Sequence, residues 1–186
     1  NKANISSTST VGGIVGINRG EILRTYNTAT ISATNTVGGI AGDNMGVIAY
    51  SYNMGYIKAS SDISGGIAGL QTENTAQIYA SYNTGNVLAN VSLVGGIIGK
   101  IDAGEIFDIY AVGQITSKSN IGMIAGQLMG GNIYNAYYDI TALEFFKPTS
   151  LSKATKAIGD LEKLDTDTVR GLLHGQMIGI NSIGQT

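Results

Sequence analysis

Apolar residues recur along the first 138 residues in short clusters that repeat about every 27 positions. The clearest marker is a Gly-Gly core followed by Ile, and the first glycine of this core falls at positions 12, 38, 65 and 95. A fifth copy begins at Gly122, where Met123 replaces the second glycine. The steps between the first glycines are 26, 27, 30 and 27 residues. A fixed period of this length is typical of solenoid proteins.

Further positions repeat in step with the Gly-Gly core. Two of these positions are apolar. One is occupied by Ile22, Ile48, Ile78, Ile106 and Ile133, and the other by Ile31, Ile57, Val87 and Ile115. Between these positions lie Tyr26, Tyr52, Tyr82 and Tyr110, and the first three tyrosines are followed by Asn27, Asn53 and Asn83. Each unit therefore reads as three short apolar segments separated by Gly, Asn, Asp and Ser, which favour tight turns.

The apolar segments predict strands and not helices. Glycines stand inside segments of only five or six residues, and each would cost a helix about 1 kcal/mol relative to Ala. A strand of this kind is stabilised when it stacks on its copy in the next turn. We therefore predict an all-β fold, a right-handed parallel β-helix with about three short strands per turn of 26–30 residues. The expected interior includes a column formed by Ile14, Ile40, Ile67, Ile97 and Ile124.

The repeated tyrosines and asparagines have two interpretations. Equivalent side chains in successive turns can stack as internal ladders that satisfy one another's hydrogen bonds. Alternatively, they can form an aromatic and amide strip that binds glycans. The ladder is the interpretation that we favour from the sequence.

Composition excludes several classes of function. The net charge is −2 and the 11 Lys and Arg residues are scattered, so no basic stripe predicts a nucleic-acid partner. No apolar run approaches the length of a membrane span, so we expect no membrane insertion. The chain has no Cys and therefore no disulfide or thiolate metal site. It opens at Asn1 without an initiator Met or a signal-peptide pattern, which indicates a processed protein or a piece of a longer one.

The repeat unit resembles the GLUG repeat family. The first two units, Val11 to Ile31 and Val37 to Ile57, begin with V-G-G-I-x-G-x-N-x-G-x-I-x-x-[ST]-Y-N, and units with an altered central turn follow at Ser64 to Val87 and Val94 to Ile115. The resemblance covers roughly residues 11 to 138. Similar repeats occur in large bacterial surface and secreted proteins, including filamentous haemagglutinin-like adhesins and the non-catalytic parts of immunoglobulin A proteases. The resemblance implies an extracellular or cell-surface setting and brings no catalytic residues with it.

The repeat ends at Tyr138, where the composition changes. The first 138 residues hold 13 charged residues, whereas the last 48 hold 11. We therefore predict a five-turn solenoid over residues 1–138 and a small, partly helical segment over 139–186. Apolar spacing predicts short helices over Leu151 to Leu164 and Thr168 to His174. This segment is expected to cap the last turn or to dock a neighbouring subunit or domain.

Candidate chemistry is sparse. Glu21 and Glu105 occupy equivalent positions three turns apart, about 14 Å, whereas the paired carboxylates of glycosidases lie roughly 5 to 9.5 Å apart. Asp43 follows a Gly-rich run similar to calcium-binding repeats, but its equivalents in other units are not acidic. His174 is the single histidine. We expect no catalytic residue, no metal site and no cofactor, and we predict that the chain is not an enzyme.

These features favour a rigid stalk that presents loops to a cell-surface receptor or glycan. One alternative is a self-assembling subunit of an extracellular filament, in which copies of the chain stack end to end. A second alternative is the non-catalytic repeat region of a secreted peptidase, in contact with neighbouring domains of a longer chain.

Overall fold

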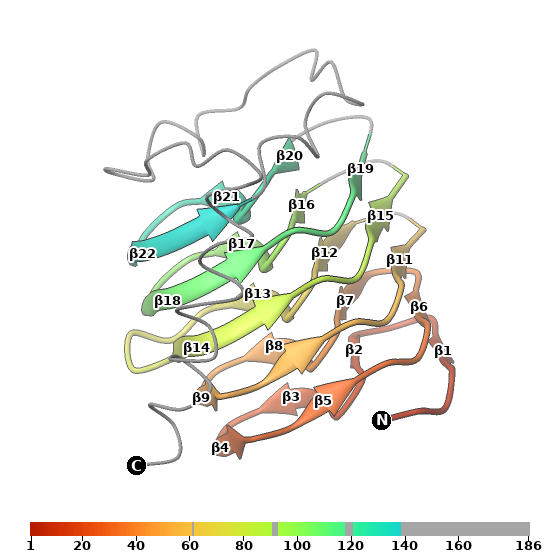
Figure 1. Cartoon of the computed structure of the whole chain (residues 1–186), viewed down its shortest axis with the longest axis horizontal. Helices are drawn as coiled ribbons and strands as arrows, with labels where there is room; N and C mark the ends of the chain where they lie inside the picture. The colour runs from red at the N-terminus through yellow and green to blue at the C-terminus, as the bar shows by residue number, and fades with distance from the viewer. Residues whose placement is uncertain (61, 91–92, 118–120, 139–186) are drawn as a thin grey trace.

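The computed structural model describes residues 1–60, 62–90, 93–117 and 121–138, which form an all-β solenoid of stacked turns (Figure 1). Strands of successive turns pair in parallel, with equivalent residues opposite one another. The predicted β-solenoid, with about five turns and a spacing near 27 residues, is confirmed. Among the described residues no helix is long and apolar enough to span a membrane.

Four parallel sheets, here named A to D, run along the solenoid. Sheet A contains β1 (Ile5–Ser7), β6 (Ile31–Ala33), β11 (Ile57–Ala59), β15 (Val87–Ala89) and β19 (Ile115–Thr116). Sheet B contains β2 (Val11–Gly12), β7 (Thr36–Gly38), β12 (Ile63–Gly65), β16 (Val94–Gly95) and β20 (Ile121–Gly122). Sheet C contains β3 (Val15–Asn18), β8 (Ala41–Asn44), β13 (Ala68–Gln71), β17 (Ile98–Ile101) and β21 (Ala125–Leu128).

Sheet D lies at the front of Figure 1 and carries the repeated tyrosines. It contains β4 (Glu21–Leu23) with β5 (Tyr26–Asn27), β9 (Val47–Ala49) with β10 (Tyr52–Asn53), and then the single strands β14 (Gln77–Asn83), β18 (Glu105–Ala111) and β22 (Asn132–Tyr138). Turn one accordingly runs from β2 to β6, turn two from β7 to β11, turn three from β12 to β15, turn four from β16 to β19, and turn five from β20 to β22.

The prediction of three strands per turn is wrong, because the Gly-Gly core forms a corner between two sheets. Val37-Gly38 ends a strand of sheet B, and Ala41 begins the next strand in sheet C. A Cβ atom at Gly39 would collide with the carbonyl oxygen of Gly66 and lie 2.5 Å from Cγ of Asn53. Only glycine allows the backbone to bend this close to its neighbours, so one apolar segment supplies two strands.

The core lies along the solenoid axis and consists of stacked isoleucines. In the predicted column that begins at Ile14, four of the five side chains are buried, namely Ile40, Ile67, Ile97 and Ile124. In the repeated position that begins at Ile31, all four side chains are buried, namely Ile31, Ile57, Val87 and Ile115. The prediction is wrong for Ile14, which is 41% exposed. Ile22 is likewise only partly buried, although Ile48 one turn further on is fully buried. Both residues belong to turn one, which has a neighbouring turn on one side only at these positions.

Residues 1–10 supply part of a turn before turn one. β1 pairs with β6 so that Ile5 lies opposite Ile31, at the same spacing of 26 residues as the first two units. Asn1 then corresponds to Asn27 and forms the same local turn, since its Oδ1 accepts from the amide of Ala3 at 3.0 Å. The repeat therefore begins before the first Gly-Gly core.

A column of left-handed residues crosses sheet D. The residues with positive φ angles are Arg24 (53°), Tyr50 (51°), Ala80 (46°), Asp108 (52°) and Asn135 (49°), one in each turn. Each lies between the Ile strand segment and the Tyr strand segment of its turn. The conformation costs roughly 1–2 kcal/mol for a residue with a side chain, and the strand segments before and after it are held by pairing with the adjacent turns.

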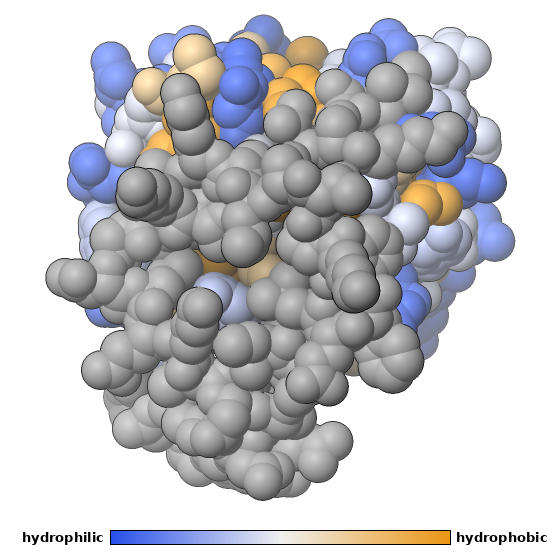
Figure 2. Space-filling view, turned by 90° about the horizontal axis from the view of Figure 1, so that it is seen from above, coloured by the Kyte–Doolittle hydropathy of each residue, from blue (hydrophilic) through white to orange (hydrophobic). Residues whose placement is uncertain are grey.

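The surface of the solenoid is mostly polar around its rim. In Figure 2, seen from above, hydrophilic side chains occupy most of the visible periphery, with scattered hydrophobic ones between them. The predicted boundary at residue 139, the segment 139–186, the two short helices and His174 all lie outside the described residues.

Candidate functional site: side-chain ladders and the surfaces beside them

A ladder of buried asparagines joins the first three turns. Asn27 donates from Nδ2 to Oδ1 of Asn53 at 2.8 Å, and Asn53 donates in the same way to Asn83 at 2.8 Å. All three side chains are fully buried. Asn1 extends the ladder, because its Nδ2 lies 3.1 Å from Oδ1 of Asn27. Each asparagine also closes a turn on its own backbone, as Asn53 does with the carbonyl and amide of Gly55.

A second buried amide ladder, in sheet C, was not predicted. Asn18 donates to Oδ1 of Asn44 at 2.8 Å, and Asn44 donates to Oε1 of Gln71 at 3.0 Å. The ladder ends where Gln71 donates to the carbonyl of Ala103 at 3.1 Å. Its signal in the sequence is an amide six residues after the first glycine of each of the first three cores.

The tyrosine ladder lies on the outer side of sheet D, which corrects its assignment to the interior. In a strand, successive side chains point to opposite faces, so burial of Asn27 places Tyr26 outside. Tyr26 is 37% exposed, and the rings of Tyr26, Tyr52, Tyr82 and Tyr110 stack with centroids 5.2, 4.9 and 4.7 Å apart. Burial raises the pKa of the Tyr110 hydroxyl above its ordinary value, and burial together with the neighbouring Tyr52 does the same for Tyr82.

This stacking limits what the tyrosines can bind. A sugar ring packs on the face of an aromatic ring, but each inner face of the ladder is covered by the next tyrosine at about van der Waals separation. The ladder therefore offers ring edges and hydroxyl groups along its length. The geometry favours a structural role for these side chains over a glycan-stacking strip.

A second aromatic stack runs beside the first and was also missed. Tyr79, Phe107 and Tyr134 lie in adjacent turns, with ring centroids 5.0 and 5.2 Å apart and nearly parallel planes. The hydroxyl of Tyr134 donates to Oε2 of Glu105 at 3.1 Å. Desolvation, followed by this hydrogen bond, raises the pKa of Tyr134. The column was not predicted because its positions in the first two turns hold Leu23 and Ala49, so no aromatic type recurs through all units.

The structure does not bring the candidate carboxylates together. Glu21 and Glu105 lie in the same column of sheet D, but Val47 and Gln77 occupy the two positions between them. Two complete turns therefore lie between the two carboxylates. Asp43 lies in a column of sheet C whose members are Ile17, Asp43, Leu70, Lys100 and Gln127. Within the described part of the chain, no group of three or more His, Cys, Asp or Glu residues could hold a metal ion.

Asp43 is nevertheless in an unusual position. Its side chain is 9% exposed, and Oδ1 has no hydrogen-bond partner. Desolvation raises the pKa of this carboxyl, Arg19 opposes the rise, and Glu73 and Asp102 add to it. A buried carboxylate with an unsatisfied oxygen is costly, so Asp43 destabilises the fold at neutral pH.

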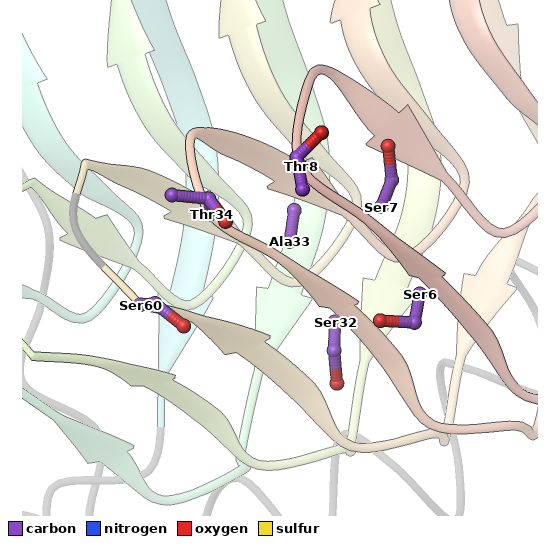
Figure 3. Close-up of a pocket in the computed structure, with 7 residues that line it drawn as sticks. All are labelled: Ser6, Ser7, Thr8, Ser32, Ala33, Thr34 and Ser60. Carbon is purple, nitrogen blue, oxygen red and sulfur yellow. The ribbon is translucent and has the colours of Figure 1, made fainter.

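A shallow hollow of about 490 Å³ lies over the first turns of sheet A and the corner that follows it (Figure 3). Its lining consists of six hydroxyl side chains and one methyl group: Ser6, Ser7, Thr8, Ser32, Ala33, Thr34 and Ser60. Such a surface can exchange hydrogen bonds with a neutral polar ligand, but no charged or aromatic side chain lines it.

Comparison with known proteins adds no relative. No protein-family model, curated protein or solved structure matches the chain.

Proposed function

We propose that this chain is a rigid solenoid module of a bacterial surface or secreted protein, with a structural or adhesive role. The proposal rests on the contrast between a repetitive interior and a variable surface. Inside, equivalent isoleucines pack from turn to turn, and equivalent amides join the first three turns. By contrast, one column of sheet C reads Ile17, Asp43, Leu70, Lys100 and Gln127, and all of these residues except Asp43 are at least partly exposed.

Such a molecule has the same backbone in every turn, whereas the side chains on its surface can differ from turn to turn. Repeat proteins use this arrangement to present extended binding surfaces, since each turn contacts only its neighbours. The resemblance of the repeat to the GLUG family supports the extracellular or cell-surface setting. A cell-surface receptor or glycan is the partner that we propose, with contact made by surface loops.

The connection between β13 and β14 is the most distinctive such loop. Turn two joins Asn44 to Val47 with two residues, whereas turn three uses the five residues 72–76 for the same step. Glu73, Asn74 and Thr75 in this loop are exposed. The insertion changes the surface without changing the strand register on either side.

An adhesion assay tests this proposal. Beads coated with the full chain are expected to bind to cells or to a glycan array above the level of uncoated beads. Replacing residues 72–76 with the Met-Gly connection of turn two is expected to lower binding at least tenfold, with unchanged circular dichroism. The control is Met129→Ser, an exposed change in turn five that should leave binding intact. Absence of binding by the folded parent chain would overturn the adhesive role.

A further inference from the structure

The tyrosine ladder places two oxidisable rings face to face in the middle of the solenoid. Tyr52 of β10 in turn two lies opposite Tyr82 of β14 in turn three, and these strands are neighbours in the front sheet of Figure 1. The ring centroids are 4.9 Å apart, and the ring planes are 3° from parallel. Because the rings are almost parallel and stem from paired residues, matching carbon atoms on the two rings are separated by about the same distance.

The position of these rings combines access with a fixed register. Both side chains lie on the outer side of sheet D and are partly exposed, so a small oxidant can reach them. Beneath them, the buried amides of Asn53 and Asn83 hold the same two strands together at 2.8 Å. A ring on the outer face can tilt about its side-chain torsions without moving the isoleucine core. Two groups that are held together in this way react as if at a high local concentration.

The second aromatic stack supplies a comparison within the same molecule. Tyr79, Phe107 and Tyr134 stack with the same near-parallel geometry, but Phe107 has no phenolic hydroxyl and separates the two tyrosines. Tyr50 lies 5.7 Å from Tyr79, but their planes meet at 81°, edge to face. A carbon–carbon bond between two rings forms through orbitals that point out of the ring planes. Stacked phenols, and not edge-to-face ones, therefore have the favourable overlap.

We propose that Tyr52 and Tyr82 form an oxidative crosslinking site, at which the two rings couple to dityrosine and join turn two to turn three. A one-electron oxidant from outside the chain, such as a haem peroxidase with hydrogen peroxide, removes one electron from each phenol, and each O–H loses its proton. The two phenoxyl radicals form one bond between the carbons ortho to their oxygens. The hydrogen on each of these carbons is then transferred as a proton to the oxygen of its own ring. The chain loses two hydrogen atoms, and one hydrogen peroxide is reduced to two water molecules.

The link would strengthen the solenoid in a way that disulfides cannot, since the chain has no Cys. It would close a loop between residues 30 positions apart and so reduce the conformational freedom of the unfolded chain. It would also add a covalent bond across an interface that is otherwise held by packing and hydrogen bonds. This property goes beyond the proposed adhesive role and depends on no receptor.

Oxidation of the full chain in dilute solution tests the proposal. A photo-activated ruthenium tris-bipyridyl complex with persulfate serves as the one-electron oxidant, and monomers are isolated by size exclusion, digested and mapped by mass spectrometry. We expect a linked pair of peptides that contains Tyr52 and Tyr82 and is lighter by two hydrogen atoms. Its yield should be at least tenfold higher than in the urea-unfolded chain under the same light dose. Equal yields in the two states, or links only between separate chains, would overturn the proposal.

Two variants of the parent chain test the assignment of the site. Tyr82→Phe removes one phenol but keeps the ring, so the mapped link should disappear while the circular dichroism is unchanged. The matched control is Tyr56→Phe, which removes an exposed tyrosine outside both stacks and should leave the link intact. Loss of the link in both variants would contradict the site, as would a Tyr50 to Tyr79 link at equal yield in the parent.

A third variant tests whether stacking alone directs the coupling. Phe107→Tyr supplies the missing phenol in the second stack, where Tyr79 and Tyr134 already carry hydroxyls on either side. We expect a new link from position 107 to Tyr79 or Tyr134 that the parent chain lacks. Its absence in the folded, oxidised variant would overturn the stacking rule on which the proposal rests.

Discussion

At the scale of single residues, buried amides are the most specific stabilising groups in this molecule. Asn53 donates to Asn83 and to Gly55 and accepts from Asn27 and from the amide of Gly55, all within 3.1 Å. In turn four, Ala111 occupies the equivalent position and the ladder stops. The repeated Asn in the sequence predicted this ladder because the same type recurs at one position in three units.

Asn53→Ala is expected to lower the free energy of unfolding by about 3 kcal/mol, because it leaves buried groups of Asn27 and Asn83 without partners. Urea denaturation measures the change. The matched control is Asn86→Ala, since Asn86 is exposed and its side-chain oxygen accepts a hydrogen bond from the amide of Gln114. This control should cost under about 1 kcal/mol, and equal losses would contradict the ladder's role.

Asp43 makes the stability of the chain depend on pH. Its folded pKa is raised, so the folded state binds more protons than the unfolded state between the unfolded pKa of 3.8 and the raised value. Stability therefore falls as the pH rises through this window. Asp43→Asn should stabilise the chain by about 1 kcal/mol at pH 7 and make little difference well below pH 3.8.

The control for this experiment is Asp62→Asn, a change at an exposed residue that is not among the groups that shift the pKa of Asp43. Surface substitutions away from buried contacts change stability by about 0.5 kcal/mol or less, so this variant should be nearly unchanged at pH 7. Unfolding in urea at several pH values supplies both curves. A loss of stability in Asp43→Asn at pH 7 would refute the desolvation argument.

At the scale of elements, the corners decide how the apolar segments are used. The periodic Gly-Gly core indicated a strand, and the structure divides it between sheets B and C. The reason is the tight packing of Gly39 against the next turn and against Asn53. In turn four, Gly96 packs against Ala111, which stands at the ladder position. In turn five, Tyr138 occupies this ladder position and Met123 replaces the second glycine.

Gly39→Ala should destabilise the chain by roughly 3 kcal/mol or more, since the added methyl meets backbone of the next turn and the buried ladder. Gly20→Ala is the matched control, because a Cβ there meets nothing within 4 Å. That change should be neutral or stabilising by up to about 1 kcal/mol. Thermal unfolding followed by circular dichroism compares the two, and similar melting temperatures would disprove the corner's role.

At the scale of the whole molecule, stability comes from stacking turns in one register. Each turn contacts only its neighbours, so the total is close to a sum of turns and interfaces. The turn-one end lacks one such interface over sheets B, C and D. This is why Ile14 is exposed although its equivalents in later turns are buried.

A register test follows from this arrangement. Fusing a copy of residues 27–52 ahead of Asn1 places Tyr52 directly before Asn1, as Tyr26 precedes Asn27. The added turn should raise the melting temperature by at least 2–4 °C, the shift expected for about 1 kcal/mol at this size. The control fusion lacks one residue of the copy. This deletion shifts the strand register by one, so that side chains meant for the core point to solvent, and the melting temperature should not rise. Equal stabilisation by both fusions would contradict register-specific stacking.

The sequence alone determined the period, the parallel solenoid, the isoleucine columns and the repeated Tyr and Asn positions. These follow because each turn stacks on a copy of itself, so the same residue type recurs where the same environment recurs. Right-handedness stays a prediction from the general preference of parallel connections.

Only the tertiary structure decided the features that depend on neighbours in space. The left-handed column joins Arg24, Tyr50, Ala80, Asp108 and Asn135, which share no residue type and are held by pairing with adjacent turns. The stack of Tyr79, Phe107 and Tyr134 and the exposure of Ile14 likewise depend on which turn lies beside them. Repetition reveals what all turns share, whereas contacts between unlike residues and the ends of the stack arise only when the turns are assembled.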